Sequence, residues 1–183
     1  FKQEKESIKE EIRKEKNIEE VKEKTIIGEN LLKGFTLKNI DIVKFNDLIN
    51  YIAEDIENMG ITTNKEEIAR LIFEREEKGN VVIPRSHVAL IHTRSDEIKE
   101  PFLGVYRIKI PIEMASVGFS FEKVNTFVVM LARNSEENEA LKLLGKISIA
   151  LIENEEFIKK LEGATVEENL EIIRRIIYSK ENE

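Results

Sequence analysis

Two runs of apolar residues near the middle of the chain constrain its fold more than any other feature. Residues 88–91 (VALI) end at His92, and residues 126–132 (TFVVMLA) form a longer run. Neighbouring residues of a strand point to opposite faces, so a run that is apolar at nearly every position predicts a strand covered on both faces. Residues 81–83 (VVI), closed by Pro84, predict a further short strand.

Residues 104–110 show a different pattern, because apolar and charged residues alternate. Tyr106, Ile108 and Ile110 share one face of the predicted strand. Arg107 and Lys109 share the other face. The alternation predicts a strand with one buried face and one exposed face.

Amphipathic helices are predicted on both sides of these strands. Apolar residues recur at helical spacing from Phe45 to Met59, and Gly60 ends this first predicted helix. A capping sequence (Thr63, Asn64, Glu66, Glu67) then opens a second helix, which ends at Gly79 and Asn80. Later in the chain, Asn134 or Ser135 can cap a helix that carries on one side Leu141, Leu144, Ile147, Ser148 and Leu151. Residues 155–161 are predicted to form a short helix, and a capping sequence at Thr165 predicts the last helix. Strands bracketed by helices predict an α/β fold with helices on both faces of a sheet.

Charge and composition exclude several classes of function. The net charge is -7, and outside the mixed-sign N-terminus no basic stripe is present, so we expect no direct nucleic acid contact by this segment. The chain has no cysteine, which excludes thiol nucleophiles and cysteine-based zinc sites. No apolar run approaches the ~20 residues of a membrane span and no signal peptide is visible, so we expect no membrane insertion and a cytoplasmic location.

The N-terminal residues differ in composition from the rest. Lys and Glu dominate residues 1–24 and often stand three or four apart, which favours a solvated linker helix, with a coiled-coil contact as the alternative. The chain begins without Met in a helical pattern, so it is interpreted as a piece of a longer protein.

The two histidines are the most suitable nucleophiles. In one regular strand His87 and His92 would point to opposite faces, which argues against a metal site built from both. His92 stands where a buried strand passes into a polar turn, a position where side chains either cap the turn or present reactive groups. Its ordinary pKa of about 6.5 leaves a neutral nitrogen at pH 7, as a phosphoryl acceptor needs.

Phosphoryl transfer also needs positive charge around the transferred group. Arg94 projects to the same face as His92 if the strand continues, and Arg75, at the end of the second predicted helix, could reach the same place. A guanidinium group can donate two hydrogen bonds to a phosphate at once. The alternative is that these arginines form only surface ion pairs with Glu74, Glu76 and Asp96.

Residues 73–84 (FEREEKGNVVIP), followed by residues 89–95 (ALIHTRS), resemble a known family. They are similar to the enzyme IIA domain of the mannitol/fructose class of the phosphoenolpyruvate-dependent sugar phosphotransferase system, in the variant at the C-terminus of mannitol-operon activators and related PRD-containing regulators. Residues 128–132, 143–148 and 152–153 also fit. The resemblance implies a mixed β-sheet sandwiched between α-helices, a phosphohistidine at His92, and a phosphate site formed with Arg75, Arg94 and Thr93, with no cofactor and no metal.

The resemblance also implies partners and a domain order. Residues 1–30 would be a charged linker helix and residues 31–183 the enzyme IIA-like domain. The rest of the regulator would hold a DNA-binding helix-turn-helix, two PRD modules and an enzyme IIB-like domain, and phosphate would come from HPr and/or enzyme IIB proteins.

One position departs from the transport-type members of the family. These place a second histidine at the start of the helix after the last central strand, where this sequence has Ala140. The departure argues against efficient onward transfer to enzyme IIB. We interpret the chain as a regulatory phosphoryl-accepting domain of a sugar-responsive bacterial transcription regulator or antiterminator. Two alternatives remain: a stand-alone enzyme IIA that passes phosphate from HPr to enzyme IIB, and a binding module that is not phosphorylated.

Overall fold

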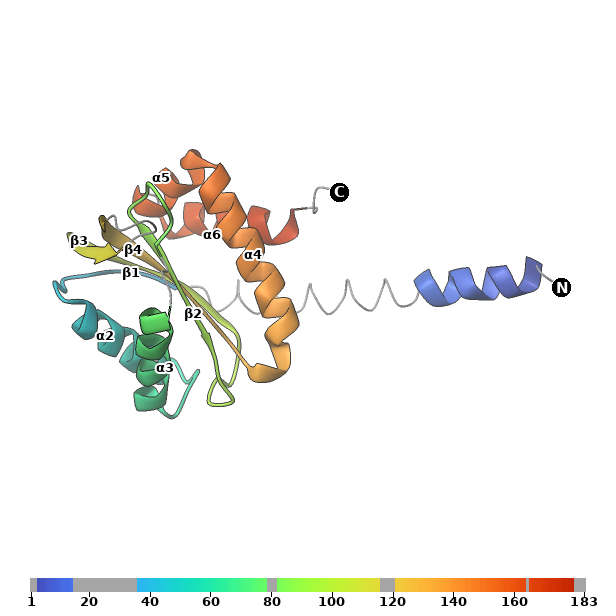
Figure 1. Ribbon diagram of the computed structural model, residues 1–183, viewed down its shortest axis with the longest axis horizontal. Coiled ribbons are helices and arrows are strands. Elements are labelled where there is room, and N and C mark those ends of the chain that lie inside the picture. Colours follow the sequence, from blue (N-terminus) through green and yellow to red (C-terminus); the bar gives the residue numbers. More distant parts are fainter. Residues whose placement is uncertain (1–2, 15–35, 79–81, 116–120, 164, 180–183) are drawn as a thin grey trace.

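The protein folds as a mixed sheet between two layers of helices (Figure 1). The computed structural model describes residues 3–14, 36–78, 82–115, 121–163 and 165–179. Within these ranges the sheet has the order β1-β3-β4-β2, formed by β1 (Thr36–Ile40), β2 (Val88–Arg94), β3 (Phe102–Ala115) and β4 (Phe121–Ala132). β3 and β4 are antiparallel, whereas β1 pairs with β3 and β2 with β4 in parallel. The predicted α/β fold is confirmed.

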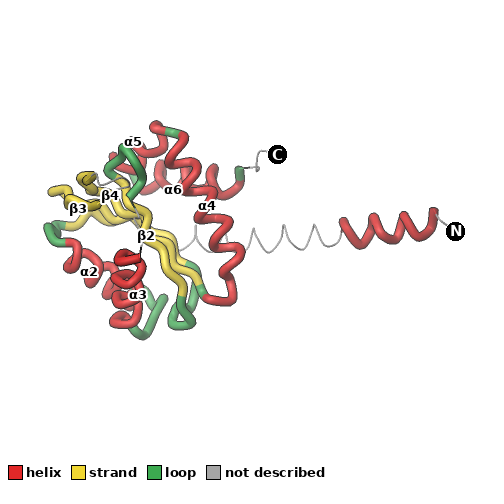
Figure 2. The backbone as a smooth tube through the Cα atoms, viewed as in Figure 1, coloured by secondary structure: helices red, strands yellow, loops and turns green. Residues whose placement is uncertain are grey.

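Helices cover both faces of the sheet (Figure 2). α2 (Phe45–Asn58) and α3 (Lys65–Lys78) lie on one face, and α4 (Glu137–Glu153), α5 (Glu155–Gly163) and α6 (Val166–Tyr178) lie on the other. Residues 3–14 form an exposed helix, as expected for the first part of the predicted linker helix. Its predicted continuation to residue 24 lies outside the described residues.

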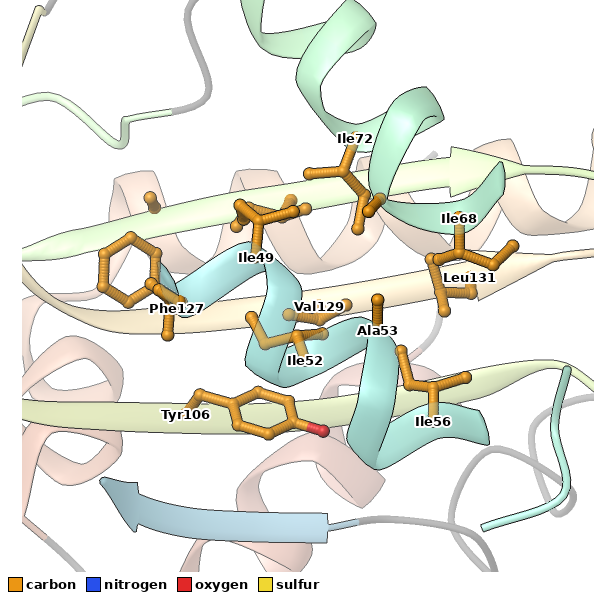
Figure 3. Packing of buried hydrophobic residues seen from close by; sticks show 14 of the residues in the cluster. Ile49, Ile52, Ala53, Ile56, Ile68, Ile72, Tyr106, Phe127, Val129 and Leu131 are labelled. Carbon is orange, nitrogen blue, oxygen red and sulfur yellow. The ribbon is translucent and has the colours of Figure 1, made fainter. Parts of the chain in front are cut away.

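Each face of the sheet has its own apolar core. Ala89 and Ile91 of β2 pack on the side of α2 and α3, together with Phe127 and Val129 of β4 (Figure 3). Val88 and Leu90, the alternate residues of β2, pack on the side of α4, α5 and α6. β2 and β4 are therefore covered on both faces, as their continuous apolar runs predicted.

The predicted helix signals of α2, α3 and α6 are present in the structure. The side chain of Asn64 accepts a hydrogen bond from the backbone N–H of Glu67, and Thr165 accepts one from Glu168. Gly60 ends α2 with a φ of 77°, which a residue with a side chain rarely adopts. α4 differs, because it begins at Glu137 after a 3-10 turn, and neither Asn134 nor Ser135 is its N-cap.

Two strand predictions were wrong, and one strand was missed. Among residues 81–83, Val82 forms an isolated bridge with Ala89 and no ladder, because the chain turns back at Pro84. In β3, a register shift between Arg107 and Ile112 leaves Ile110 60% exposed, although alternation placed it on the buried face. β1 was not predicted, since its five residues (TLKNI) carry no clear alternation.

Arg107 was predicted on an exposed face but is only half exposed. Its Nε donates a hydrogen bond of 2.6 Å to the carbonyl oxygen of Leu161, near the end of α5. The carbonyl groups at a helix C-terminus carry partial negative charge, so a guanidinium there is stabilising. Arg107 thereby connects α5 to the sheet.

A buried polar contact links β1, α2 and β3. The carboxylate of Asp55 is buried, forms an ion pair with Lys38, and accepts a hydrogen bond of 2.7 Å from the hydroxyl of Tyr106. Burial, and then this bond to Asp55, raise the pKa of Tyr106 well above its usual value, so the hydroxyl stays a donor.

We expect Tyr106→Phe to lower the free energy of unfolding by about 1.5–3 kcal/mol, because a buried carboxylate loses a donor. Urea unfolding measures the change. Tyr51→Phe is the matched control: Tyr51 meets Tyr106 edge to face but is only half-buried, so the cost should be smaller. Equal costs for the two variants would contradict this role of the Tyr106 hydroxyl.

Candidate functional site

His92 lies near the end of β2, the outer strand of the sheet. β2 runs through Thr93 to Arg94, two residues beyond the apolar run. Because a strand alternates its side chains, His92 and Arg94 belong to the same face as Leu90. Beyond β2 the sheet has no further strand in the described residues, so this edge is open between α3 and α4.

A pocket of about 490 Å³ occupies this edge. Its walls come from four elements: Leu71, Glu74, Arg75 and Lys78 of α3; His92, Thr93 and Arg94 of β2; Met130 and Ala132 of β4; and Ala140, Leu141 and Leu144 of α4. One part of the lining is cationic and the other is apolar. The structure thus brings all four predicted site residues, Arg75, His92, Thr93 and Arg94, into one pocket.

The closest polar neighbour of the His92 ring comes from α3. Nη2 of Arg75 lies 3.5 Å from Nε2 of His92. A guanidinium group only donates hydrogen bonds, so this contact favours the neutral tautomer with the proton on Nδ1 and the lone pair on Nε2. The lone pair therefore lies beside a fixed positive charge.

The surroundings of His92 keep its ring neutral. The side chain is half-buried, and burial lowers the pKa of His92 below its ordinary value, with the charge of Arg75 acting in the same direction. A neutral ring is the form that can act as a nucleophile.

The lowered pKa of His92 predicts a pH-dependent stability. Between that pKa and about 6.5 the unfolded chain binds more protons at this position than the folded chain, so the free energy of unfolding rises with pH. The penalty is absent above about pH 6.5 and complete below the folded-state pKa. Urea unfolding at about pH 5 and about pH 7.5 should show a smaller pH effect in His92→Gln than in the unsubstituted chain. Identical pH effects would exclude a lowered pKa.

His87 lies elsewhere and has different neighbours. It precedes β2, and its Nδ1 lies 2.8 Å from the carbonyl oxygen of Lys123. Its backbone N–H donates to the carboxylate of Glu162 on α5. As predicted from their positions, the two histidines do not share one site.

Sequence reasoning missed part of the pocket. Lys78 stands one helical turn after Arg75, and this spacing places both residues on one side of α3, which could have revealed it. Leu141 was predicted on the apolar side of its helix, but it is 54% exposed and lines the pocket. Ala140 also lines the pocket, so the position where the family resemblance places a second histidine belongs to the same pocket as His92.

Comparisons with known proteins agree with this fold and sequence pattern. Residues 31–176 match the family described as "Phosphoenolpyruvate-dependent sugar phosphotransferase system, EIIA 2", and the chain belongs to this family. A relative named as transcriptional regulator MtlR of Streptococcus mutans is 27% identical over 126 residues. That match covers 69% of this chain and 19% of the relative, so the chain spans about a fifth of the relative's length.

Solved structures show the same fold. Nitrogen regulatory protein IIA-Ntr from Neisseria meningitidis matches with a TM-score of 0.66 and 19% identity, over 83% of this chain and 99% of that one. IIA mannitol from Escherichia coli matches with a TM-score of 0.53 and 19% identity, over 75% and 94%. The same enzyme IIA in complex with phosphorylated enzyme IIB matches with a TM-score of 0.54 and 18% identity, over 75% and 92%.

Within the described ranges, no helix has both the length and the apolar character needed to cross a membrane.

Proposed function

We propose that this chain is a regulatory phosphoryl-accepting domain, with His92 as the acceptor. The domain would act in the cytoplasm as part of a sugar-responsive transcription regulator and would receive phosphate from HPr or an enzyme IIB protein. The observation that carries the proposal is the His92 ring with Arg75 at 3.5 Å, in a pocket that also holds Thr93 and Arg94. The lowered pKa of His92, caused by burial and by Arg75, supports it because it favours the neutral ring. The family to which the chain belongs is named for phosphoenolpyruvate-dependent phosphotransfer.

The proposed reaction is a transfer between two imidazole rings. The Nε2 lone pair of His92 forms a bond to the phosphorus of a donor phosphohistidine, and the bond from phosphorus to the donor nitrogen breaks. The electron pair of that bond returns to the donor ring. The proton on Nδ1 of His92 stays in place during the step. The guanidinium group of Arg75 leaves the Nε2 lone pair for the phosphoryl oxygens and, together with Arg94, offsets their charge.

Two observations favour a regulatory role over a transport role. The relative MtlR is named as a transcriptional regulator. In addition, Ala140 gives the pocket wall a methyl group, so His92 is the only imidazole that lines the pocket among the described residues. A bound phosphate adds about two negative charges at this open edge, which changes how a neighbouring domain can dock there.

The test is phosphorylation of the unsubstituted chain. We expect incubation with phosphoenolpyruvate, enzyme I and HPr, or with a phosphorylated enzyme IIB, to add one phosphoryl group, measured by intact mass. The group should be lost in acid and kept in base, as a phosphoramidate is. No mass gain from either donor would overturn the proposal and favour a non-phosphorylated binding module.

A second measurement separates regulation from transport. Enzyme IIA of the Escherichia coli mannitol system forms a complex with phosphorylated enzyme IIB. If this chain is regulatory and receives its phosphate from HPr, the phosphorylated domain should keep its phosphate for longer than a transport-type enzyme IIA when each is mixed with its enzyme IIB. Equally fast transfer would support the transport alternative.

A further inference from the structure

A chain of ion pairs follows one side of α3 and ends at the pocket. Arg70 contacts Glu67 at 2.6 Å and Glu74 at 2.7 Å, and Lys78 contacts the other oxygen of Glu74 at 3.1 Å. Glu74 thus accepts from two cations at once, one on each side along the helix. Both contacts keep the pKa of Glu74 below its ordinary value, so its carboxylate is charged.

The last pair of this chain lies inside the pocket. Glu74 and Lys78 both line it, together with Arg75 and His92. Lys78 is the final residue of α3, and its side chain is 68% exposed, so its ammonium group has room to move. A Lys side chain is long and flexible, and its ammonium group has no fixed geometry for its partner.

We infer that Lys78 is a further phosphate-binding residue of the His92 site, and that Glu74 holds it while the site is unphosphorylated. In this arrangement the carboxylate of Glu74 binds the ammonium group of Lys78, which would otherwise be available to the phosphoryl oxygens. Arrival of a dianionic phosphoryl group draws Lys78 away from Glu74, and Arg70 continues to neutralise Glu74. The inference rests on the proposed function and names two more residues of the same site.

Simple electrostatics supports this exchange. The C-terminal end of α3 carries partial negative charge, which by itself would repel a phosphate, and Arg75 and Lys78 are the basic side chains of its last turn that offset this charge. A surface pair such as Lys78 with Glu74 contributes little free energy, so it can be exchanged at low cost. A phosphate dianion is the stronger competitor because it carries more charge than one carboxylate.

The first experiment titrates inorganic phosphate into the unphosphorylated chain at about pH 8, with the His92 ring observed by NMR and assigned with the help of His87→Gln. Lys78→Gln should weaken the binding roughly two- to fivefold, and Glu74→Gln should tighten it roughly two- to fivefold, as expected for surface charges. Glu77→Gln is the matched control, since Glu77 lies on α3 outside the pocket lining and should leave binding unchanged. If Glu74 merely stabilises the helix, Glu74→Gln should not tighten phosphate binding.

A double variant tests whether Glu74 acts through Lys78. In the Lys78→Gln background, Glu74→Gln should not tighten phosphate binding, because no ammonium group remains that Glu74 could hold. An equal gain in both backgrounds would show that Glu74 repels phosphate directly and would overturn its holding role. Unchanged binding in Lys78→Gln would overturn the role of Lys78.

Failure here is distinct from failure of the proposed function. If the unsubstituted chain gains a phosphoryl group but Lys78→Gln and Glu74→Gln bind inorganic phosphate and react as it does, only this inference is wrong. If the unsubstituted chain gains no phosphoryl group from either donor, the proposed function is wrong, whatever the titration shows.

Discussion

His92→Gln will take up no phosphoryl group from phosphoenolpyruvate, enzyme I and HPr. Glutamine is polar and of similar size, so the pocket should keep its shape while the nucleophilic lone pair is lost. Among the described residues that line the pocket, His92 is the only one with a ring nitrogen, and Arg75 lies beside it. The measurement is the intact mass of the protein after the reaction, compared with that of the unsubstituted chain.

The second histidine supplies a matched control for this experiment. His87 is exposed, and its ring contacts the Lys123 carbonyl oxygen outside the pocket. His87→Gln should therefore react at an unchanged rate. A mass gain that persists in His92→Gln and disappears in His87→Gln would reverse the assignment of the acceptor.

Arg75→Gln will slow the phosphorylation of His92 by about a hundredfold, because one donor aimed at developing charge is typically worth that much. Its guanidinium group is the nearest positive charge to Nε2 of His92. Loss of this charge also removes one of the two causes that lower the pKa of His92, so the ring should titrate at higher pH. Arg75→Lys should restore part of the rate, since it keeps the charge without the planar fork.

Arg175→Gln is the control for the loss of a surface arginine. Arg175 is exposed on α6 and pairs with Glu171, away from the pocket. Its loss should leave both the rate and the His92 titration unchanged. If Arg75→Gln behaved in the same way, Arg75 would be only a surface charge, and the phosphate site would have to be built from other residues.

The elements that a local pattern defines could be predicted from sequence. The run that ends at His92 and the run that ends at Ala132 predicted strands covered on both faces because nearly every residue in them is apolar. Asn64 and Thr165 marked helix starts because each side chain accepts a hydrogen bond within its own turn. Such signals depend only on neighbours in the chain, and no long-range contact overrides them here.

The errors arose where long-range contacts decide. The register shift after Arg107 depends on how β3 meets β4, so the exposure of Ile110 could not follow from alternation alone. Arg107 is half-buried because a carbonyl group of α5 lies within reach. β1 is a strand because β3 offers it a free edge, and its own sequence predicts little.

The candidate site was predicted in part. His92, Thr93 and Arg94 follow one another in the chain, and Arg75 stands at the end of the predicted helix before them, where the resemblance also implies an arginine. These four positions could therefore be predicted before the structure. The approach of Arg75 to Nε2 of His92 and the entry of Glu74 into the same pocket depend on how α3 packs beside β2. The sequence placed both side chains on one helix but could not place that helix against the strand.

The order of the strands separates His92, the proposed phosphoryl acceptor, from β1 at the opposite edge of the sheet. His92 lies on one margin, β2, and Thr36 begins the opposite margin, β1, with β4 and β3 between them. Phosphate added at the first margin lies the full width of the sheet from the second. A neighbouring domain that responds to this phosphate would detect it most directly by contacting the surface around the pocket.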